Sequence, residues 1–209
     1  NGYIKRLPVD EFKSQHRGGR GVKGMGVHKD DFIEQLISSS THDMLLFFTN
    51  SGKVYSMKGY EVPEYGRAAQ GIPIINLLGI NNKEKISAVI NVSHETNDDD
   101  KYLFFTTKLG TVKRTAVTEF KNIRSNGLKA LNLHENDELI DVEVISEDQP
   151  MIIGTHNGYA LSFKSSVVRS MGRSAAGVRG IRLRDEDYVI GAAPLNYDSK
   201  VLVISENGF

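Results

Sequence analysis

Leu109-Gly110-Thr111-Val112-Lys113-Arg114 is the stretch that decides the fold, because copies of its pattern recur along the whole chain. A short apolar run precedes each later copy, and strand-forming residues follow the turn glycine. The turn glycines, spaced 50, 58, 48 and 50 residues apart, are Gly2, Gly52, Gly110, Gly158 and Gly208. A strand, a short glycine turn and a second strand are typical of a β-hairpin. The sequence therefore predicts a repeated hairpin.

Each hairpin is followed by a second landmark glycine and two further strands. The landmark glycines, 19, 19, 17 and 19 residues after the turn glycines, are Gly21, Gly71, Gly127 and Gly177. The third strands are expected at residues 22–25, 72–75, 128–131 and 178–183. A polar, mostly acidic turn then leads to fourth strands at residues 32–38, 86–92, 139–145 and 188–193. Residues 202–205 form the apolar run before the last turn, and residues 8–12 and 117–120 could each make one helical turn.

Four short strands in each period of about fifty residues are typical of blades in a propeller-like array. The periods cover approximately residues 1–49, 50–107, 108–157 and 158–209. A β-sandwich with accidental similarity between its strands is the alternative. The sequence begins and stops inside hairpins in the same phase, so we expect one domain fragment cut from a longer array.

The composition excludes several classes of site. The 209 residues contain no cysteine, which rules out disulfides and thiolate metal sites. The six histidines share no ligand spacing, there is no P-loop motif, and no catalytic constellation is found. We therefore expect no catalytic residue, no metal site and no cofactor in this chain.

Charge is segregated along the chain although 26 basic and 26 acidic residues cancel. Residues 1–29, 108–129 and 158–184 carry +5, +5 and +6, whereas residues 130–157 carry −7. Because equivalent parts of each blade lie at the same radius, the cations are predicted to form one basic band. Such a band is the electrostatic footprint of a protein that bends a polyanion around itself. Loop solvation alone is the alternative explanation.

Arginines mark the loops before the landmark glycines. Arg17, Arg67 and Arg173 lie four residues before their glycines, and Arg124 lies three before its own. The first of these loops, Gln15-His16-Arg17-Gly18-Gly19-Arg20-Gly21, combines backbone freedom with planar phosphate-binding forks. The predicted DNA-contacting residues are Gln15, Arg17, Gly18, Gly19, Arg20, Gly21, Lys5, Arg6, Lys23, Arg67, Lys113, Arg114, Arg124, Lys129, Arg169, Arg173 and Arg179.

The whole chain resembles the C-terminal domain family of the DNA gyrase A subunit. The resemblance rests on residues 15–21, which match the family pattern Q-R-R-G-G-(K/R)-G, and on Gly2-Tyr3-Ile4-Lys5-Arg6, Lys58-Gly59-Tyr60-Glu61-Val62-Pro63 and Gly71-Ile72-Pro73. His16 departs from the pattern, because arginine is usual there, and makes the charge at this position depend on pH.

The resemblance implies an all-β β-pinwheel, a disc of normally six four-stranded blades that exchange strands with their neighbours. Four periods could then form an open arc. It also implies a DNA-binding domain without a catalytic site, which wraps double-stranded DNA around a basic rim so that the parent gyrase can introduce negative supercoils. The parent is an ATP-hydrolysing topoisomerase that uses ATP and Mg²⁺ elsewhere. It assembles from two A and two B subunits in the bacterial cytoplasm, associated with the nucleoid, without a membrane partner.

Two other functions stay open from the sequence. One is a protein-binding β-propeller scaffold, although the chain has no tryptophan and hence no Trp-Asp repeat. The other is the equivalent domain of topoisomerase IV, from which the segment at residues 15–21 would distinguish a gyrase.

Overall fold

The computed structural model describes residues 2–12, 17, 24–27, 31–93, 100–196, 198, 200–205 and 207–208. Within these residues the chain is all-β, as predicted, with five single-turn 3-10 helices and no α-helix. The strands are β1 (Tyr3–Ile4), β2 (Met44–Thr49), β3 (Lys53–Lys58), β4 (Ile72–Pro73), β5 (Ile86–Val92), β6 (Tyr102–Thr107), β7 (Thr111–Ala116), β8 (Leu128–Lys129), β9 (Leu139–Ile145), β10 (Pro150–Thr155), β11 (Ala160–Lys164), β12 (Val178–Arg179) and β13 (Val189–Pro194).

The short helices lie where the chain leaves a hairpin or enters a turn. They are η1 (Val9–Glu11), η2 (Gly59–Glu61), η3 (Ile74–Asn76), η4 (Val117–Phe120) and η5 (Ser165–Val167). Both predicted helical turns are found, as η1 and η4. The sequence did not predict η2, η3 or η5.

The sheets repeat one plan, in which the first strand of each hairpin is central. The two four-stranded sheets have the orders β5-β2-β3-β8 and β12-β7-β6-β9, and a three-stranded sheet has the order β11-β10-β13. All these pairings are antiparallel. The fourth strand of each period therefore pairs with the first strand of its own hairpin, on the side away from the second.

Neighbouring periods exchange their third strands. The edge strand β8 pairs with β3 of the preceding period, and β12 pairs with β7. At the start of the chain, β4 pairs with β1 in the same way. Every described third strand thus completes the sheet of the blade before it, which is the strand exchange of a β-pinwheel.

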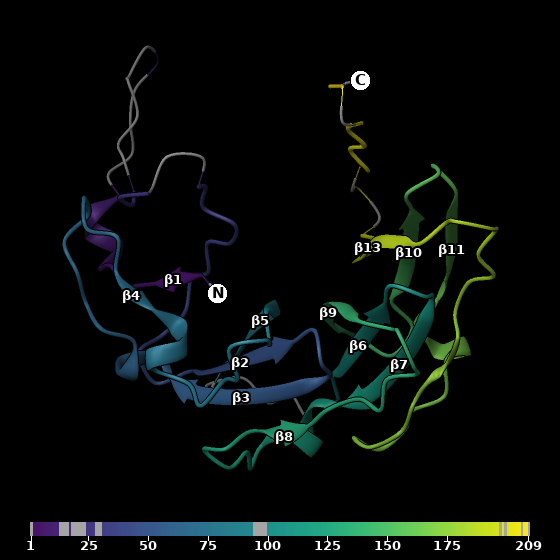
Figure 1. Ribbon diagram of the computed structural model, residues 1–209, viewed down its shortest axis with the longest axis horizontal. Coiled ribbons are helices and arrows are strands. Elements are labelled where there is room, and N and C mark those ends of the chain that lie inside the picture. Colours follow the sequence, from purple (N-terminus) through teal and green to yellow (C-terminus); the bar gives the residue numbers. More distant parts are fainter. Residues whose placement is uncertain are drawn as a thin grey trace.

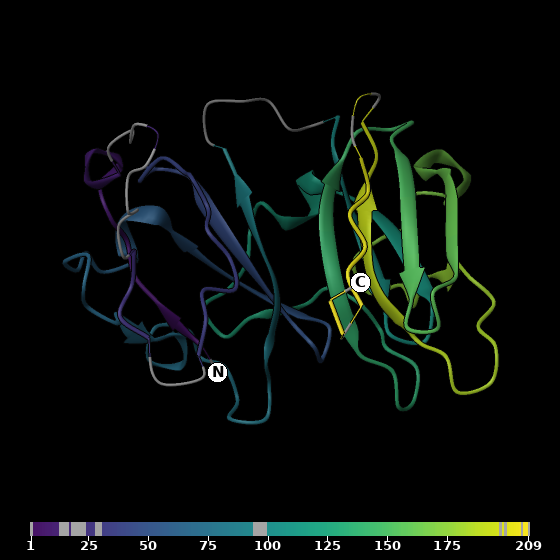
Figure 2. The same ribbon diagram turned by 90° about the horizontal axis from the view of Figure 1, so that it is seen from above.

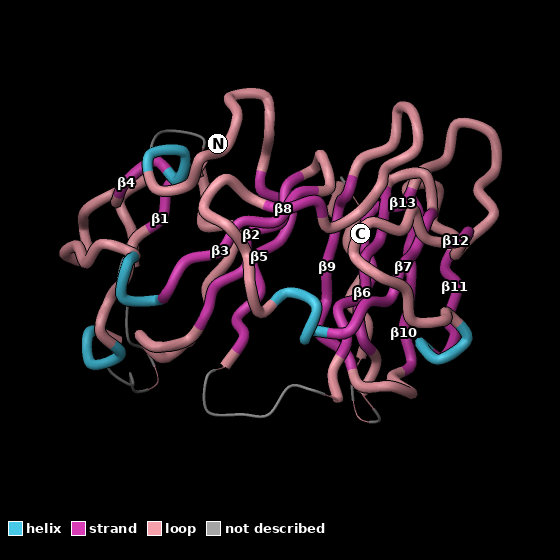
Figure 3. The backbone as a smooth tube through the Cα atoms, turned by 90° about the horizontal axis from the view of Figure 1, so that it is seen from below, coloured by secondary structure: helices cyan, strands magenta, loops and turns pink. Residues whose placement is uncertain are grey.

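The blades stand side by side along an open arc (Figure 1). The strands β5 and β9 face the inside of this arc, and β8 and β11 lie toward its outside. Views along the plane of the arc show the strands of the last sheet running across its thickness, so that their connections lie at the two faces (Figures 2 and 3). This arrangement excludes the β-sandwich, whose two sheets would pack face to face.

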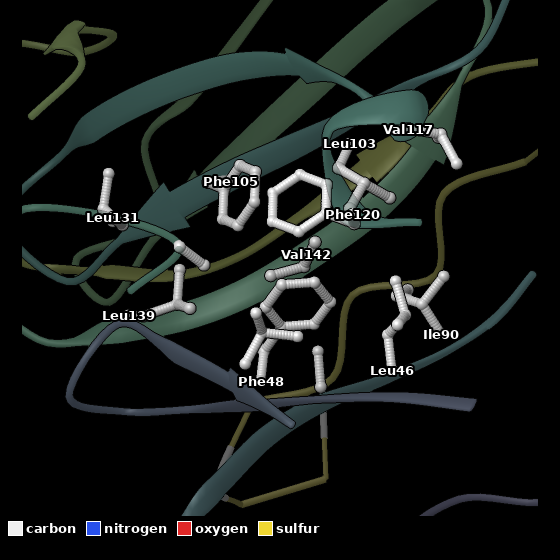
Figure 4. Close-up of a cluster of buried hydrophobic side chains, with 13 residues drawn as sticks. Leu46, Phe48, Ile90, Leu103, Phe105, Val117, Phe120, Leu131, Leu139 and Val142 are labelled. Atoms are coloured by element: carbon white, nitrogen blue, oxygen red, sulfur yellow. The ribbon is translucent and has the colours of Figure 1, made fainter. Parts of the chain in front are cut away.

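The hydrophobic core is divided into clusters that lie between adjacent blades. Phe48 of β2 packs edge-on against Phe105 of β6, with ring centroids 5.5 Å apart (Figure 4). Leu46 and Ile90 join the same cluster from the first of these blades, and Phe120 of η4 joins it from the second. Two further clusters fill the junctions on either side. One blade cannot bury its apolar faces alone, so each blade depends on the next.

A turn glycine forms the contact point of each junction. Gly52 has a φ of +76°, a conformation that glycine adopts without strain. Its carbonyl oxygen accepts hydrogen bonds from the N–H groups of Ala130 and Leu131, at 2.8 and 3.0 Å, just after the exchanged strand β8. A Cβ atom at Gly52 would lie 2.7 Å from the Leu131 carbonyl oxygen. The position thus needs glycine for its backbone conformation and for the close approach of the next period.

Several expected strands are shorter than predicted or are not formed. The third strands at residues 72–75, 128–131 and 178–183 are two residues long, because the chain after them turns onto the preceding hairpin. Residues 32–38 and 202–205 are described and are not strands. A fourth strand pairs with the first strand of its own hairpin, and no described strand pairs with residues 32–38 or 202–205.

Two carboxyl groups lie on the inner strand β9, next to the last sheet. The Asp141 carboxylate accepts a hydrogen bond from the Ala192 N–H of β13 at 3.3 Å. Burial raises the pKa of Asp141, and burial together with the Asp141 charge raises the pKa of Glu143 to about 7. Burial at this junction therefore makes protonation of both carboxyl groups more favourable than in water, because the protonated form has no charge to desolvate.

The Gly52 junction predicts a difference between two glycine substitutions. Gly158→Ala strains the backbone, since φ is +81°, but meets no other atom, and should lower the unfolding free energy by about 1 kcal/mol. Gly52→Ala has the same strain and also collides with the exchanged strand, so its cost should be greater by about 1–3 kcal/mol. Urea denaturation measures both. Equal costs would contradict the close approach at Gly52.

The buried Glu143 predicts a contribution to stability that falls as pH rises. A folded-state pKa above the unfolded value means that the folded chain binds this proton more tightly, so the contribution of Glu143 is greatest at low pH and is lost between about pH 4.5 and 7. The loss attributable to Glu143 should be on the order of 2 kcal/mol. Glu143→Gln should reduce this dependence in thermal unfolding at each pH, whereas Glu138→Gln at an exposed position should keep it. An unchanged pH dependence in Glu143→Gln would rule out this origin.

Candidate nucleic-acid interface

The outer edge of the arc is built from the exchanged strands and the loops that lead into them. We call residues 66–71, 121–127 and 172–177 the rim loops, because each precedes β4, β8 or β12. The sheet order places β8 and β12 on the edge opposite to the inner strands β5 and β9 (Figure 1). The landmark glycines end these loops with φ values of +89°, +78° and +92°. The predicted arginine loops therefore occupy one equivalent position on successive blades.

Exposed cations lie along this edge. Six of the predicted DNA-contacting residues have exposed side chains. Four of them lie in rim loops or exchanged strands, and Arg169 lies three residues before the rim loop at residues 172–177. The six are Arg17, Arg67, Arg124, Lys129, Arg169 and Arg179. Arg182, also exposed, follows β12 in the same cationic segment but was not singled out from the sequence. The sequence feature that could have identified Arg182 is the charge of +6 over residues 158–184, to which it contributes.

Lys113 was predicted to contact DNA, and the structure places it inside the protein instead. Its side chain is 0% exposed. The ammonium group donates hydrogen bonds to the carbonyl oxygens of Ala130, Gly172 and Arg173 and lies 4.8 Å from the centre of the Phe105 ring. Burial lowers the pKa of Lys113 to about 8, and the Glu119 carboxylate opposes this shift. Lys113 is thus an internal cation that holds a rim loop.

Lys5 has the same function two junctions earlier, where the first two periods meet. Its ammonium group donates to the carbonyl oxygens of Gly66, Arg67 and Ala69 at 3.1, 2.7 and 2.8 Å. Burial lowers the pKa of Lys5. These bonds direct its charge at the protein's own backbone and give Lys5 a structural role, while its DNA contact stays a prediction.

Arg114 and Arg6 follow the two lysines and are also turned inward. Arg114 is 5% exposed, donates to the Glu147 carbonyl oxygen at 3.0 Å and stacks 4.4 Å from the centre of the Tyr102 ring. Arg6 is half-buried, donates to the Val62 carbonyl oxygen at 3.1 Å and pairs with the Glu64 carboxylate at 2.9 Å. Arg114 was predicted to contact DNA, but its side chain is buried and bound within the protein. The Glu64 carboxylate neutralises the charge of Arg6.

Arg173 is intermediate in exposure between the exposed rim cations and the cations that are turned inward. Its side chain is partly exposed and reaches back to the preceding period, where Nη1 donates to the Glu119 carbonyl oxygen at 3.0 Å and Nε lies 3.9 Å from the Glu119 carboxylate. This contact fixes the rim loop at residues 172–177 against η4. The remaining predicted residues, Gln15, Gly18, Gly19, Arg20, Gly21 and Lys23, lie outside the described residues.

Acidic residues of the polar turns accept hydrogen bonds from residues of the hairpins. Glu84 accepts hydrogen bonds from the Ser51 and Tyr55 hydroxyls at 2.8 and 3.0 Å. Asp137 accepts one from the Leu109 N–H at 2.9 Å, and Asp187 accepts one from the Asn157 N–H at 3.0 Å. These bonds lower the pKa of Glu84 and Asp187 although desolvation opposes the shift. The periodicity of negative charge therefore has a structural cause in addition to any effect on DNA.

Comparison with known proteins identifies the family. The sequence model of one protein family, described as the DNA gyrase C-terminal domain, a beta-propeller, matches residues 1–40, 43–93, 101–146 and 149–196 of the chain. The chain belongs to the DNA gyrase C-terminal domain family. This result agrees with the strand exchange and with the repeated rim loops.

The curated relatives of this gyrase C-terminal domain are much longer proteins. The DNA gyrase A subunit of Streptococcus pneumoniae serotype 4 is 60% identical over 174 residues, which are 83% of this chain and 21% of the relative. The DNA gyrase A subunit of Staphylococcus epidermidis is 48% identical over 211 residues, covering 100% of this chain and 24% of the relative. The chain thus spans less than a quarter of these relatives.

Solved structures share the fold. The C-terminal domain of a DNA topoisomerase IV has a TM-score of 0.78 and 29% identity, covering 93% of this chain and 58% of that one. A DNA gyrase A C-terminal domain has a TM-score of 0.71 and 30% identity, covering 92% and 61%. Among the described residues, no helix is long and apolar enough to span a membrane, and no group of histidine, aspartate and glutamate side chains is arranged to hold a metal ion.

The internal role of Lys113 predicts a stability difference between two lysines of the same charge. Lys113→Met should lower the unfolding free energy by about 1–3 kcal/mol, because it leaves buried carbonyl oxygens without a donor. Lys129→Met, at an exposed position on β8, should change it by less than about 0.5 kcal/mol. Urea denaturation of both variants checks this. A Lys113→Met variant as stable as the parent would refute the structural role.

Proposed function

We propose that this chain is a DNA-wrapping domain that binds the phosphate backbone of duplex DNA along the outer edge of its arc. The observation that carries the proposal is the recurrence of exposed cations at this edge in successive periods: Arg67, then Arg124 and Lys129, then Arg179. Each of these residues belongs to a rim loop or to an exchanged strand. Equivalent cations on successive blades would meet successive stretches of one polyanion.

The arrangement favours contacts with phosphates over contacts with bases. The exposed cations belong to rim loops and exchanged strands. These segments lie along the convex side of the arc, and no described strand or helix projects outward from it (Figure 1). Phosphate contacts position a duplex but carry no sequence information. We therefore expect a bent duplex and little base preference.

The larger role follows from the relatives that are DNA gyrase A subunits. As the C-terminal domain of such a protein, the chain would wrap DNA so that ATP-dependent strand passage by the parent enzyme introduces negative supercoils. The chain itself would be non-catalytic. Its partners would be double-stranded DNA, the gyrase B subunit, and the rest of the gyrase A subunit in an A2B2 complex.

Gyrase is favoured over topoisomerase IV by sequence similarity. The curated gyrase A subunits are 60% and 48% identical to the chain. The solved structures do not distinguish the two enzymes, since the topoisomerase IV domain is 29% identical to the chain and the gyrase A domain 30%. A protein-binding scaffold has no comparable support. We also propose that residues 1–209 form one β-pinwheel fragment with four periods. The lack of a cofactor in this chain, with ATP and Mg²⁺ acting elsewhere, and a cytoplasmic, nucleoid-associated location also remain predictions.

Binding of a linear DNA duplex across a salt series tests the electrostatic part of the proposal. The affinity should fall steeply with salt. The double variant Arg124→Ala/Lys129→Ala should reduce the slope by about one for each lost phosphate contact. A matched double variant, Lys83→Ala/Lys85→Ala, removes two exposed lysines before the inner strand β5 and should leave the slope near that of the parent.

Energy transfer between dyes on the two DNA ends, measured in the same samples, tests the wrapping. Transfer should increase on binding because the duplex curves around the arc. Affinity that does not depend on salt, or equal effects of the two double variants, would overturn the proposed surface. Binding without a change in end-to-end distance would overturn the wrapping.

A further inference from the structure

Two rim loops are held by the same internal contact. The Lys5 ammonium binds the carbonyl oxygens of Gly66 and Arg67, and the Lys113 ammonium binds those of Gly172 and Arg173. Gly66 and Gly172, like Arg67 and Arg173, occupy equivalent positions in loops of identical length. Each loop thus presents two consecutive carbonyl groups to a cation on its inner side.

The peptide planes then determine the direction of the neighbouring N–H groups. In a trans peptide the C=O and the following N–H point in opposite directions, and the described chain has no cis peptide. The N–H groups of Arg67 and Ala68 therefore point away from Lys5, and those of Arg173 and Ser174 point away from Lys113. Within the described part of the chain, none of these four N–H groups donates a hydrogen bond.

The glycines that begin these loops leave the outer side open. Gly66 and Gly172 are both exposed, and a Cβ atom at either position would meet no atom within 4 Å. Neither has the positive φ that would require glycine. Packing and backbone strain therefore do not explain glycine here, whereas the approach of a ligand to the backbone would.

The rim loop at residues 121–127 provides a contrast. The hairpin behind it has Tyr55 at the position of the two lysines, and the interval from turn glycine to landmark glycine in the loop's own period is 17 residues instead of 19. The Tyr55 ring fills the space beside Gly127, where a Cβ atom would lie 2.6 Å from Tyr55 Cε1. The 19-residue interval and the internal lysine thus occur together, and the period with the 17-residue interval has neither.

We propose that the rim loops at residues 66–71 and 172–177 are phosphate-binding sites, in which two consecutive backbone N–H groups hold one phosphate of the DNA backbone. Successive N–H groups that point in one direction form an anion-binding concavity. The lysine behind each loop orients these groups and adds a positive charge on their inner side. The proposal rests on the proposed function, and it adds backbone donors to the rim cations.

Nuclear magnetic resonance of the ¹⁵N-labelled chain, titrated with a short linear DNA duplex, tests the two sites directly. The amide protons of Arg67, Ala68, Arg173 and Ser174 should shift downfield and saturate together with DNA binding. Amides of the rim loop at residues 121–127, such as those of Asn122 and Asn126, should not shift in this way. DNA binding without these downfield shifts would overturn the proposal, and it would leave the DNA-wrapping function intact.

Two variants separate the loops. Lys5→Met should abolish the shifts of Arg67 and Ala68 and keep those of Arg173 and Ser174, and Lys113→Met should do the reverse. Each variant loses one positive charge, so each is the control for the other, and the unaffected loop reports that the fold is intact. Shifts that persist in both variants would show that the lysines do not orient the N–H groups. Failure of the unmodified chain to bind DNA at all would instead contradict the proposed function.

Discussion

The hydrogen bonds between a turn glycine and the third strand of the next period support the rest of this structure. The Gly52 carbonyl oxygen binds two N–H groups after β8, and the Gly110 carbonyl oxygen binds the N–H groups of Gly180 and Ile181 at 2.8 and 3.3 Å. At the start of the chain, the Gly2 carbonyl oxygen binds the Ile74 N–H at 3.0 Å. This contact brings each exchanged strand to the outer edge and sets neighbouring blades against each other, so that their apolar faces form the shared core.

Charge serves two purposes in this fold. One set of cations and anions is internal: Lys113 and Lys5 hold rim loops, and Asp137 and Asp187 hold hairpin turns. A second set, which includes Arg124 and Lys129, is exposed at the edge. The internal carboxylates and the exposed cations recur in successive blades, whereas the internal lysine is replaced by Tyr55 in the second hairpin. The internal lysines connect the two purposes, since the loops that they hold form part of the edge.

The prediction of the fold succeeded where it depended on local patterns. The strands β5 and β9 match the predicted ranges, and η4 occupies the predicted helical turn. The turn glycines Gly52, Gly110, Gly158 and Gly208 have positive φ because a short hairpin turn demands it. The prediction failed at residues 32–38 and 202–205, whose apolar alternation is that of strands although no strand of the described residues pairs with them. The third strands were overestimated for a related reason, since only two residues of each meet a neighbouring strand.

The sequence by itself determined the period, the all-β class, the position of each hairpin and the segregation of charge, because these properties depend on residues that are close together in the chain. The direction of each charged side chain was decided only by the tertiary structure. Lys113 and Lys129 lie in the same cationic segment, yet one is fully buried and the other exposed. The carbonyl oxygens that bind Lys113 come partly from the next period, about sixty residues away along the chain. No local pattern contains that contact, because it exists only after strand exchange has brought the two periods together.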